Sequence, residues 1–326
     1  MVNQDNKHTQ SSLDQEEVVI PTVEGGELTS VPEFEQDEIQ GSAKQYSYSQ
    51  MVWIRFRKHK MAFAGACIVL LLLIGAIFAG VISGGQNPSF ADINYRFLPP
   101  FTPGHFLGTD DVGRDVWARL LYGGRTSLLI GFLVAIPAGI FGGIIGSISG
   151  YFGGWVDSLL MRLVEIFFSI PTLPILVTLS SYWGANIWNI VGLLVFFGWA
   201  PTARMIRGLV LQIKEYEFIE AAKAIGCSNS RIIFRHILPN TLAILIVQIT
   251  LKVGGAILSE STLSFLGLGV DPSEPTWGNM LSNAQNFMWN APHLVIWPGM
   301  MIFLTILSFN FLGDGLRDAL DPKLKQ

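Results

Sequence analysis

The sequence predicts an all-α, polytopic membrane protein with about six transmembrane helices. Half of its 326 residues are hydrophobic, and only 14% are charged. It also contains several apolar runs that reach roughly 20 residues, the length with which a helix crosses a bilayer core of about 30 Å. A soluble chain of this size would have to bury each such helix on every side, so the composition disfavours a large soluble helical domain.

The first span is the clearest of the six. Residues 61–82 contain no charged side chain, and the run is too long and too far along the chain to be the apolar part of a signal peptide. We therefore expect a retained span at 61–83. The other five spans are predicted at 126–149, 158–180, 186–204, 241–262 and 294–313. Three prolines interrupt the third and fourth spans, which membrane helices tolerate; they are Pro171, Pro174 and Pro201.

Basic residues predict the orientation of these spans, because they gather on the cytoplasmic side. Four of them directly precede the first span: Arg55, Arg57, Lys58 and Lys60. This places the N-terminus in the cytoplasm, together with the basic loop at 205–240 and the C-terminus. The loop at 260–293 then lies outside and contains no Lys or Arg. The first outer loop is an exception, but its arginines are balanced by aspartates. We expect a multi-pass protein of the cytoplasmic membrane.

Residues 1–50 form a separate, acidic segment. They contain ten Asp and Glu residues against two lysines, and no long apolar run. Such a segment cannot offset the entropy cost of folding, so we expect a disordered cytoplasmic tail followed by a transmembrane domain at 51–326. The tail is either an interaction arm or a solvated extension.

The second predicted span has small residues at helical spacing: Gly139, Gly142, Gly143, Gly146, Ser147 and Gly150. Small residues four apart allow two membrane helices to approach closely. The sequence therefore predicts that this face packs against another helix.

The sequence lacks several common nucleotide-binding, metal-binding and catalytic motifs. It has no GxxxxGK[ST] phosphate loop, no HExxH zinc motif and no GxSxG nucleophile motif. The five histidines and two cysteines are scattered without metal-ligand spacing. We predict that the chain is not an enzyme and has no catalytic, cofactor-binding or metal-binding residue.

The loop at 205–240 contains a short amphipathic helix. Phe218, Ala221, Ala222 and Ile225 follow the spacing of one helical face. This face lies either on the membrane surface or in a groove of a soluble partner. The two alanines favour docking, because small side chains allow close approach to a protein and anchor poorly in lipid.

The end of that helix and the start of the next have recognisable signals. Gly226 suits the left-handed position that ends a helix. Ser228 or Ser230 can cap a second short helix. Pro239 then opens the next span at a position that tolerates proline.

This loop resembles the EAA loop of ABC importer permeases in residues and in spacing. The residues that carry the resemblance are Glu220, Ala221, Ala222, Gly226, Leu238 and Pro239. The family has an apolar residue three before the proline, where this chain has His236. The resemblance implies that the loop is a coupling helix seated in a cleft of an ATP-hydrolysing subunit.

Three further stretches, at 106–131, 260–281 and 312–325, resemble dipeptide and oligopeptide permeases. The resemblance covers the chain from about residue 49 and implies the type I ABC importer permease fold and a role in ATP-driven peptide import. It implies a second homologous permease, two cytoplasmic ATP-binding subunits, an extracellular substrate-binding protein and membrane lipid as partners, and no nucleic acid. The partner subunits use ATP, and this chain binds no cofactor.

Other cargoes and mechanisms stay open at this point. Relatives of this permease type also import nickel, other metal chelates or glutathione. An ion-coupled secondary transporter would need ionisable residues along its spans and usually an inverted repeat, whereas these spans are nearly free of charge. A membrane scaffold without transport is disfavoured by the proline-broken spans.

Residues 115–122 form an amphipathic helix that we place flat on the outer surface, because Trp117 and Tyr122 suit a membrane interface.

Lys252 lies eleven residues into the fifth span, near the middle of the bilayer, where a lysine facing lipid is costly. It either pairs with a carboxylate such as Glu165 or faces a translocation pathway.

Overall fold

The computed structural model describes residues 47–184 and 186–320, which form helices and connecting loops without any strand. The predicted acidic tail, 1–50, lies outside the described residues except for its last four. Of these four, Ser47 precedes the first described helix, α2 (Tyr48–Lys58), and the other three are its first residues.

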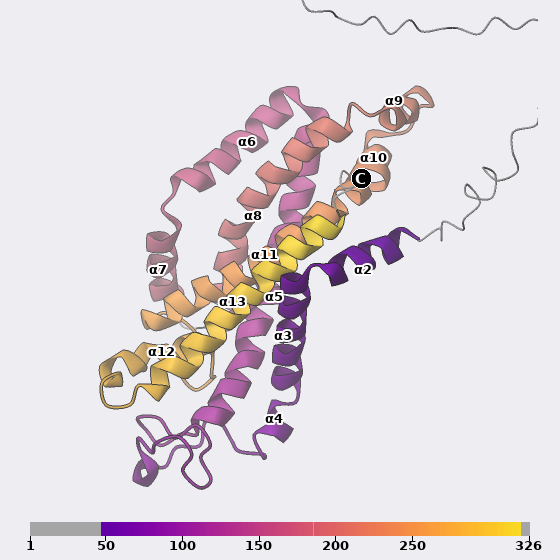
Figure 1. Ribbon diagram of the computed structural model, residues 1–326. Coiled ribbons are helices and arrows are strands. Elements are labelled where there is room, and N and C mark those ends of the chain that lie inside the picture. Colours follow the sequence, from indigo (N-terminus) through magenta and orange to yellow (C-terminus); the bar gives the residue numbers. More distant parts are fainter. Residues whose placement is uncertain (1–46, 185, 321–326) are drawn as a thin grey trace, which may run out of the picture. The chain divides into compact units, whose positions relative to one another are not determined.

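The other elements follow in chain order: α3 (Lys60–Ile77), α4 (Ala79–Ile82), η1 (Ile93–Tyr95), α5 (Val116–Phe152), α6 (Gly154–Ser169), α7 (Thr172–Trp183), α8 (Ile187–Ile213), α9 (Glu217–Ala224), α10 (Asn229–Ile232), η2 (Ile233–Ile237), α11 (Leu238–Phe265), α12 (Trp277–Ala284), η3 (Gln285–Phe287) and α13 (His293–Leu320). Long helices form one bundle, with α9 and α10 at one end and α12 and α4 at the other (Figure 1). We refer to these as the α9 end and the α12 end.

The structure confirms the prediction of about six spans. Five described helices, counting the run from 229 to 265 as one, are long and apolar enough to cross a membrane, and the bent pair α6 and α7 makes a sixth if the two helices together form one broken span. The protein is therefore a multi-pass membrane protein. Pro201 and Pro171 have different effects on their helices. The helix α8 continues through Pro201, whereas α6 and α7 meet at an angle of 79°.

The bend between α6 and α7 follows from the sequence around Pro171. Proline disfavours helical angles in the residue before it, which is pushed towards an extended conformation. Ile170 has φ −81° and ψ 123° accordingly, and α6 ends there. The third span is thus two shorter helices joined at an angle.

The prediction of a separate helix lying flat at 115–122 is wrong. These residues form the first turns of α5, which runs without interruption for 37 residues from Val116 to Phe152. Asp115 caps α5 by accepting a hydrogen bond from the Ala118 amide at 2.7 Å. Val116 and Leu120 are buried in the core with residues of α12 and α13, so tertiary packing holds this segment in the bundle as part of α5.

The small-residue face of α5 packs closely on other helices, as predicted. A Cβ atom at Gly142 would lie 2.5 Å from the Trp199 carbonyl oxygen of α8, and one at Gly146 would lie 2.4 Å from the Ala203 carbonyl oxygen. A Cβ atom at Gly139 would meet Ile249 of α11 at 2.3 Å. The α5–α8 contact therefore requires glycine.

We expect a Gly146→Leu substitution to destabilise the chain. The added side chain collides with the backbone of α8, and overpacking of this kind typically costs about 1–3 kcal/mol or more. Gly192 in α8 is a matched control, because a Cβ there meets nothing within 4 Å. The thermal unfolding midpoint in detergent should fall for Gly146→Leu and stay near wild type for Gly192→Leu. Equal midpoints would contradict the packing argument.

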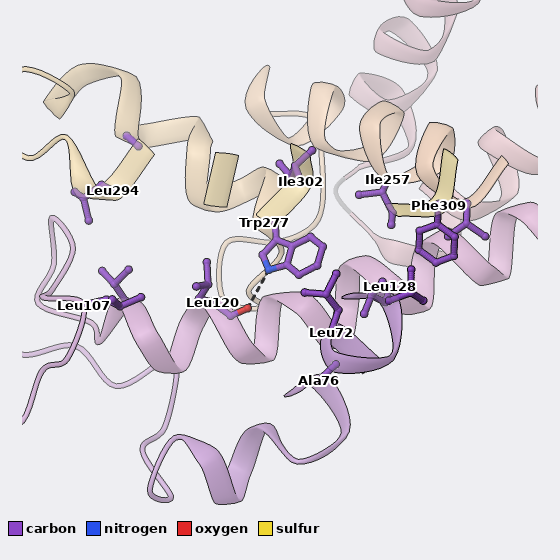
Figure 2. Packing of buried hydrophobic residues seen from close by; sticks show 14 of the residues in the cluster. Leu72, Ala76, Leu107, Leu120, Leu128, Ile257, Trp277, Leu294, Ile302 and Phe309 are labelled. Atoms are coloured by element: carbon purple, nitrogen blue, oxygen red, sulfur yellow. Dashed lines mark hydrogen bonds between the residues drawn. The ribbon is translucent and has the colours of Figure 1, made fainter. Parts of the chain in front are cut away.

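Trp277 connects the α12 end to α5. The indole is 1% exposed, and its Nε1 donates a hydrogen bond to the Leu120 carbonyl oxygen at 2.9 Å (Figure 2). Its backbone amide donates to Ser127 Oγ at 3.1 Å. Gly124 makes room for the ring, since a Cβ there would lie 2.8 Å from it. The loop between α11 and α12 is therefore folded back onto the bundle.

Candidate functional site

The segment that follows α8 forms the predicted helix–turn–helix. The helix α9 ends at Ala224, and Gly226 has φ +78°, the left-handed conformation that favours glycine. Of the two serines considered, Ser228 caps α10, with its side chain accepting from the Arg231 amide. Pro239 lies in the first turn of α11. These local predictions are confirmed.

The face that α9 turns towards its own chain differs from the predicted one. Of the predicted apolar stripe, only Ala222 is buried, whereas Ile225 is 80% exposed and Phe218 is 41% exposed. Ile219, which lies outside the stripe, makes the inward contact and is fully buried with Ile206 of α8 and other residues. Most of the apolar stripe of α9 therefore has no cover from the described residues.

An ion pair joins three helices near this end. Arg207 of α8 donates to both carboxylate oxygens of Asp157 in α6, at 2.5 and 2.6 Å. Ser149 of α5 donates to the same carboxylate at 2.5 Å. This carboxylate thus links α5, α6 and α8 close to where α9 is attached. The sequence does not single out this ion pair, because the only signal of it is two opposite charges near the ends of two predicted spans.

A second contact ties α10 to α5. The Tyr151 hydroxyl donates to Asn229 Oδ1 at 2.9 Å, and the Lys223 ammonium lies 5.9 Å from the centre of the Tyr151 ring. The α9–α10 segment is consequently held to the bundle through Ile219 and through Tyr151, which packs against the same cluster.

Lys252 has a backbone partner. Its Nζ donates to the Gly198 carbonyl oxygen of α8 at 2.6 Å, three residues before Pro201. Glu165, the carboxylate considered for it, instead pairs with Arg162 at 3.0 Å. Within residues 47–184 and 186–320, Lys252 has no carboxylate partner, so its charge is not neutralised there.

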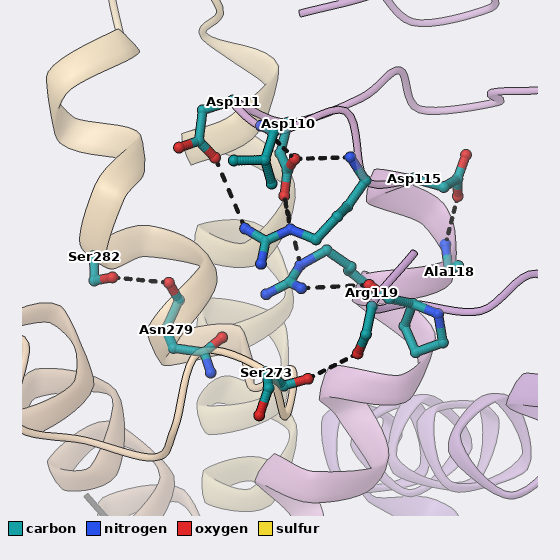
Figure 3. A network of polar contacts seen from close by, with 12 residues as sticks. Asp110, Asp111, Asp115, Ala118, Arg119, Ser273, Asn279 and Ser282 are labelled. Atoms are coloured by element: carbon teal, nitrogen blue, oxygen red, sulfur yellow. Dashed lines mark hydrogen bonds and ion pairs between the residues drawn. The ribbon is translucent and has the colours of Figure 1, made fainter. Parts of the chain in front are cut away.

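Charged residues of the first long loop pair among themselves at the α12 end (Figure 3). Asp110 lies 2.6 Å from Arg114 Nε and 3.8 Å from Arg119 Nε. Asp111 lies 3.8 Å from Arg114 Nη2. Arg119 is only 3% exposed and also donates to the Pro88 carbonyl oxygen at 3.3 Å. Two aspartates of the first outer loop thus balance two arginines through direct ion pairs.

A buried carboxylate joins α11 to α12. Glu260 is fully buried and accepts hydrogen bonds from Ser264 Oγ at 2.7 Å and Thr276 Oγ1 at 3.0 Å. Its hydroxyl partners satisfy a group that would be costly to bury alone. In the part of the chain that the structure describes, no group of three His, Cys, Asp or Glu side chains could hold a metal ion.

The spans, the glycine-lined contact between α5 and α8 and the short amphipathic helix at one end define the chain as a multi-pass membrane protein. The family "Binding-protein-dependent transport system inner membrane component" matches residues 142–326. The "N-terminal TM domain of oligopeptide transport permease C" matches residues 47–100. The chain therefore belongs to the family of binding-protein-dependent transport permeases, whose members are not themselves enzymes.

Individual relatives agree with this assignment. Glutathione transport system permease proteins of Escherichia coli and Shigella boydii are each 41% identical over 273 residues, which cover 84% of this chain and 90% of theirs. A dipeptide transport system permease protein of Alkalihalophilus pseudofirmus is 42% identical over 273 residues, covering 83% of this chain and 88% of its own. The similarity therefore extends over nearly the whole membrane domain.

Proposed function

We propose that this chain is the permease subunit of an ATP-driven importer that carries di- or oligopeptides across the cytoplasmic membrane. The observation that carries the mechanism is the exposed apolar face of α9, whose opposite side is held to the spans by Ile219. A helix exposed on one side and anchored on the other is suited to sit in a groove of a partner. Glu220, Ala221 and Gly226 lie on or next to this helix.

The assembly that this implies has several parts. A second homologous permease completes the pathway, two cytoplasmic ATP-binding subunits receive the coupling helices, and an extracellular binding protein delivers the substrate. The N- and C-termini and the α9 end lie in the cytoplasm, and the α12 end lies outside. ATP is used by the partner subunits. It shifts the permease between inward- and outward-open states through its different affinity for the two.

Uptake into proteoliposomes tests the proposal. The complete complex should accumulate labelled di- or oligopeptides only when ATP and the binding protein are present. Glutathione is the second candidate cargo, because relatives at 41% identity are named for its transport, and it should be offered in parallel. Uptake driven by an ion gradient without ATP would instead indicate a secondary transporter.

We expect Lys252→Met to separate peptides by their C-terminal charge. In this proposal the uncompensated ammonium beside Gly198 faces the pathway and attracts a peptide's terminal carboxylate. The variant keeps the length of the side chain and removes the charge. Uptake of free-carboxylate peptides should fall more than uptake of the same peptides with amidated C-termini. Equal losses for both would assign Lys252 a structural role towards α8.

A further inference from the structure

The helix α2 turns away from the first span instead of prolonging it. Between α2 and α3, His59 has φ −82° and ψ 91°, an extended conformation that interrupts the helix. Its Nδ1 accepts a hydrogen bond from the Ala62 amide at 3.1 Å, so α3 starts directly after the bend. Figure 1 shows α2 running away from the end of α3 at a steep angle.

One side of α2 is held by the end of α13. Phe56 is 7% exposed and packs in a cluster with Ala62 of α3 and Ala319 of α13. Val52, one turn before Phe56, packs against the same cluster. This contact decides which residues of α2 face outward.

The outward side of α2 combines an aromatic side chain with cations. Trp53 is 56% exposed, and Arg57 and Lys58 are exposed one turn further along the helix. Lys60 is exposed just after the bend, and Met61 beside it is 51% exposed. We call Arg57, Lys58 and Lys60 the bend cations. Within residues 47–184 and 186–320, none of the three takes part in an ion pair.

This combination favours a lipid headgroup as the partner. Tryptophan prefers the interface between headgroups and hydrocarbon, and helices that lie in this interface carry Lys and Arg beside their aromatic residues. Basic side chains directly next to a span attract anionic lipids. The acidic residues 1–46 of the same chain are the other nearby source of negative charge. They contain no long apolar run that would cover Trp53 and Met61.

We propose that Trp53 and the bend cations form a binding site for the headgroup of an anionic phospholipid such as phosphatidylglycerol. The cations contact the phosphate, and the indole lies at the level of the glycerol backbone. The site is at the end of α3 opposite to α4 and the α12 end (Figure 1). The proposal goes beyond the proposed function and takes from it only the orientation, in which this end of α3 faces the cytoplasm.

Photo-crosslinking in the complete transporter tests this site. Benzoylphenylalanine replaces Trp53 in complexes reconstituted into nanodiscs with equal amounts of phosphatidylglycerol and phosphatidylcholine, and mass spectrometry identifies the adducts. Phosphatidylglycerol adducts should exceed phosphatidylcholine adducts roughly fivefold, because the bend cations attract the anionic lipid. The control has the same probe in place of Leu71, which is 69% exposed on α3 and far from the bend, and should show no preference.

Variants of the bend cations test the cause of the preference. Combining Arg57→Gln, Lys58→Gln and Lys60→Gln should make the adducts of the two lipids equal. Combining Arg57→Lys, Lys58→Arg and Lys60→Arg keeps the charges and should keep the preference. If the neutralised variant does not insert, about 0.5 M NaCl should weaken the preference in the complex with unchanged cations, because salt screens exposed charges.

Several results would overturn the proposal. They are an equal preference at positions 53 and 71, the absence of lipid adducts at position 53, and a preference that persists after neutralisation or in high salt. Adducts of the probe with residues 1–46 would also overturn it, because the bend cations would then face the acidic tail. Failure of the proposed function is a separate result, namely the absence of ATP-dependent uptake by the wild-type complex.

Discussion

Replacing Ala221 by tryptophan should abolish transport while the permease still inserts and assembles its own fold. Ala221 lies on the exposed side of α9, so a bulky side chain there disturbs the partner surface without disturbing the inward contact of Ile219. Loss of a central interface contact typically costs about 2 kcal/mol or more, which corresponds to a roughly 30-fold weaker association. Peptide uptake into proteoliposomes and copurification of the ATP-binding subunits would both be measured.

A bulky substitution at Ala222, next to Ala221, would be a less clear test of docking. Ala222 is buried against its own chain, so a bulky residue there would displace α9 and mix two effects. Gln212→Trp is the control for Ala221→Trp, because Gln212 is exposed near the end of α8 and outside α9. Normal uptake by Ala221→Trp, or equal losses in both variants, would remove the coupling role from α9.

The second large effect is expected on breaking the Asp157–Arg207 ion pair. Asp157→Asn leaves the Arg207 guanidinium, whose side chain is 31% exposed, without its charged partner. Removing one member of a buried pair costs about 2–5 kcal/mol, and the partial exposure of Arg207 places the expected loss at the lower end of that range. The unfolding midpoint in detergent should fall clearly, because α5, α6 and α8 meet at this carboxylate.

The chain provides a matched control for that substitution. Arg162 and Glu165 form a pair on α6 whose side chains are 78% and 54% exposed, and exposed pairs contribute less than about 1 kcal/mol. Arg162→Gln should therefore leave the unfolding midpoint close to wild type. If both variants lowered the unfolding midpoint equally, the contact between α5, α6 and α8 would not depend on Asp157.

Much of the fold follows from patterns within short stretches of sequence. The apolar runs predicted six spans because a helix in lipid must be apolar along its length, whatever it packs against. Gly226 predicted a helix end and Ser228 or Ser230 a helix start, because their effects act on the backbone within a few residues. The EAA-like residues identified the loop for the same reason, since they lie within about twenty positions of one another.

Tertiary structure decided the features that depend on residues far apart in the chain. The first turns of α5 have the pattern of a surface helix but belong to one 37-residue helix inside the bundle, because the Trp277 ring packs on them. The buried face of α9 is set by Ile219, because α8 and η2 offer their isoleucines on that side. Asp157 and Arg207 meet across 50 positions. Local sequence patterns constrain which helices form and where they end, whereas which faces and charges meet depends on how the finished helices pack.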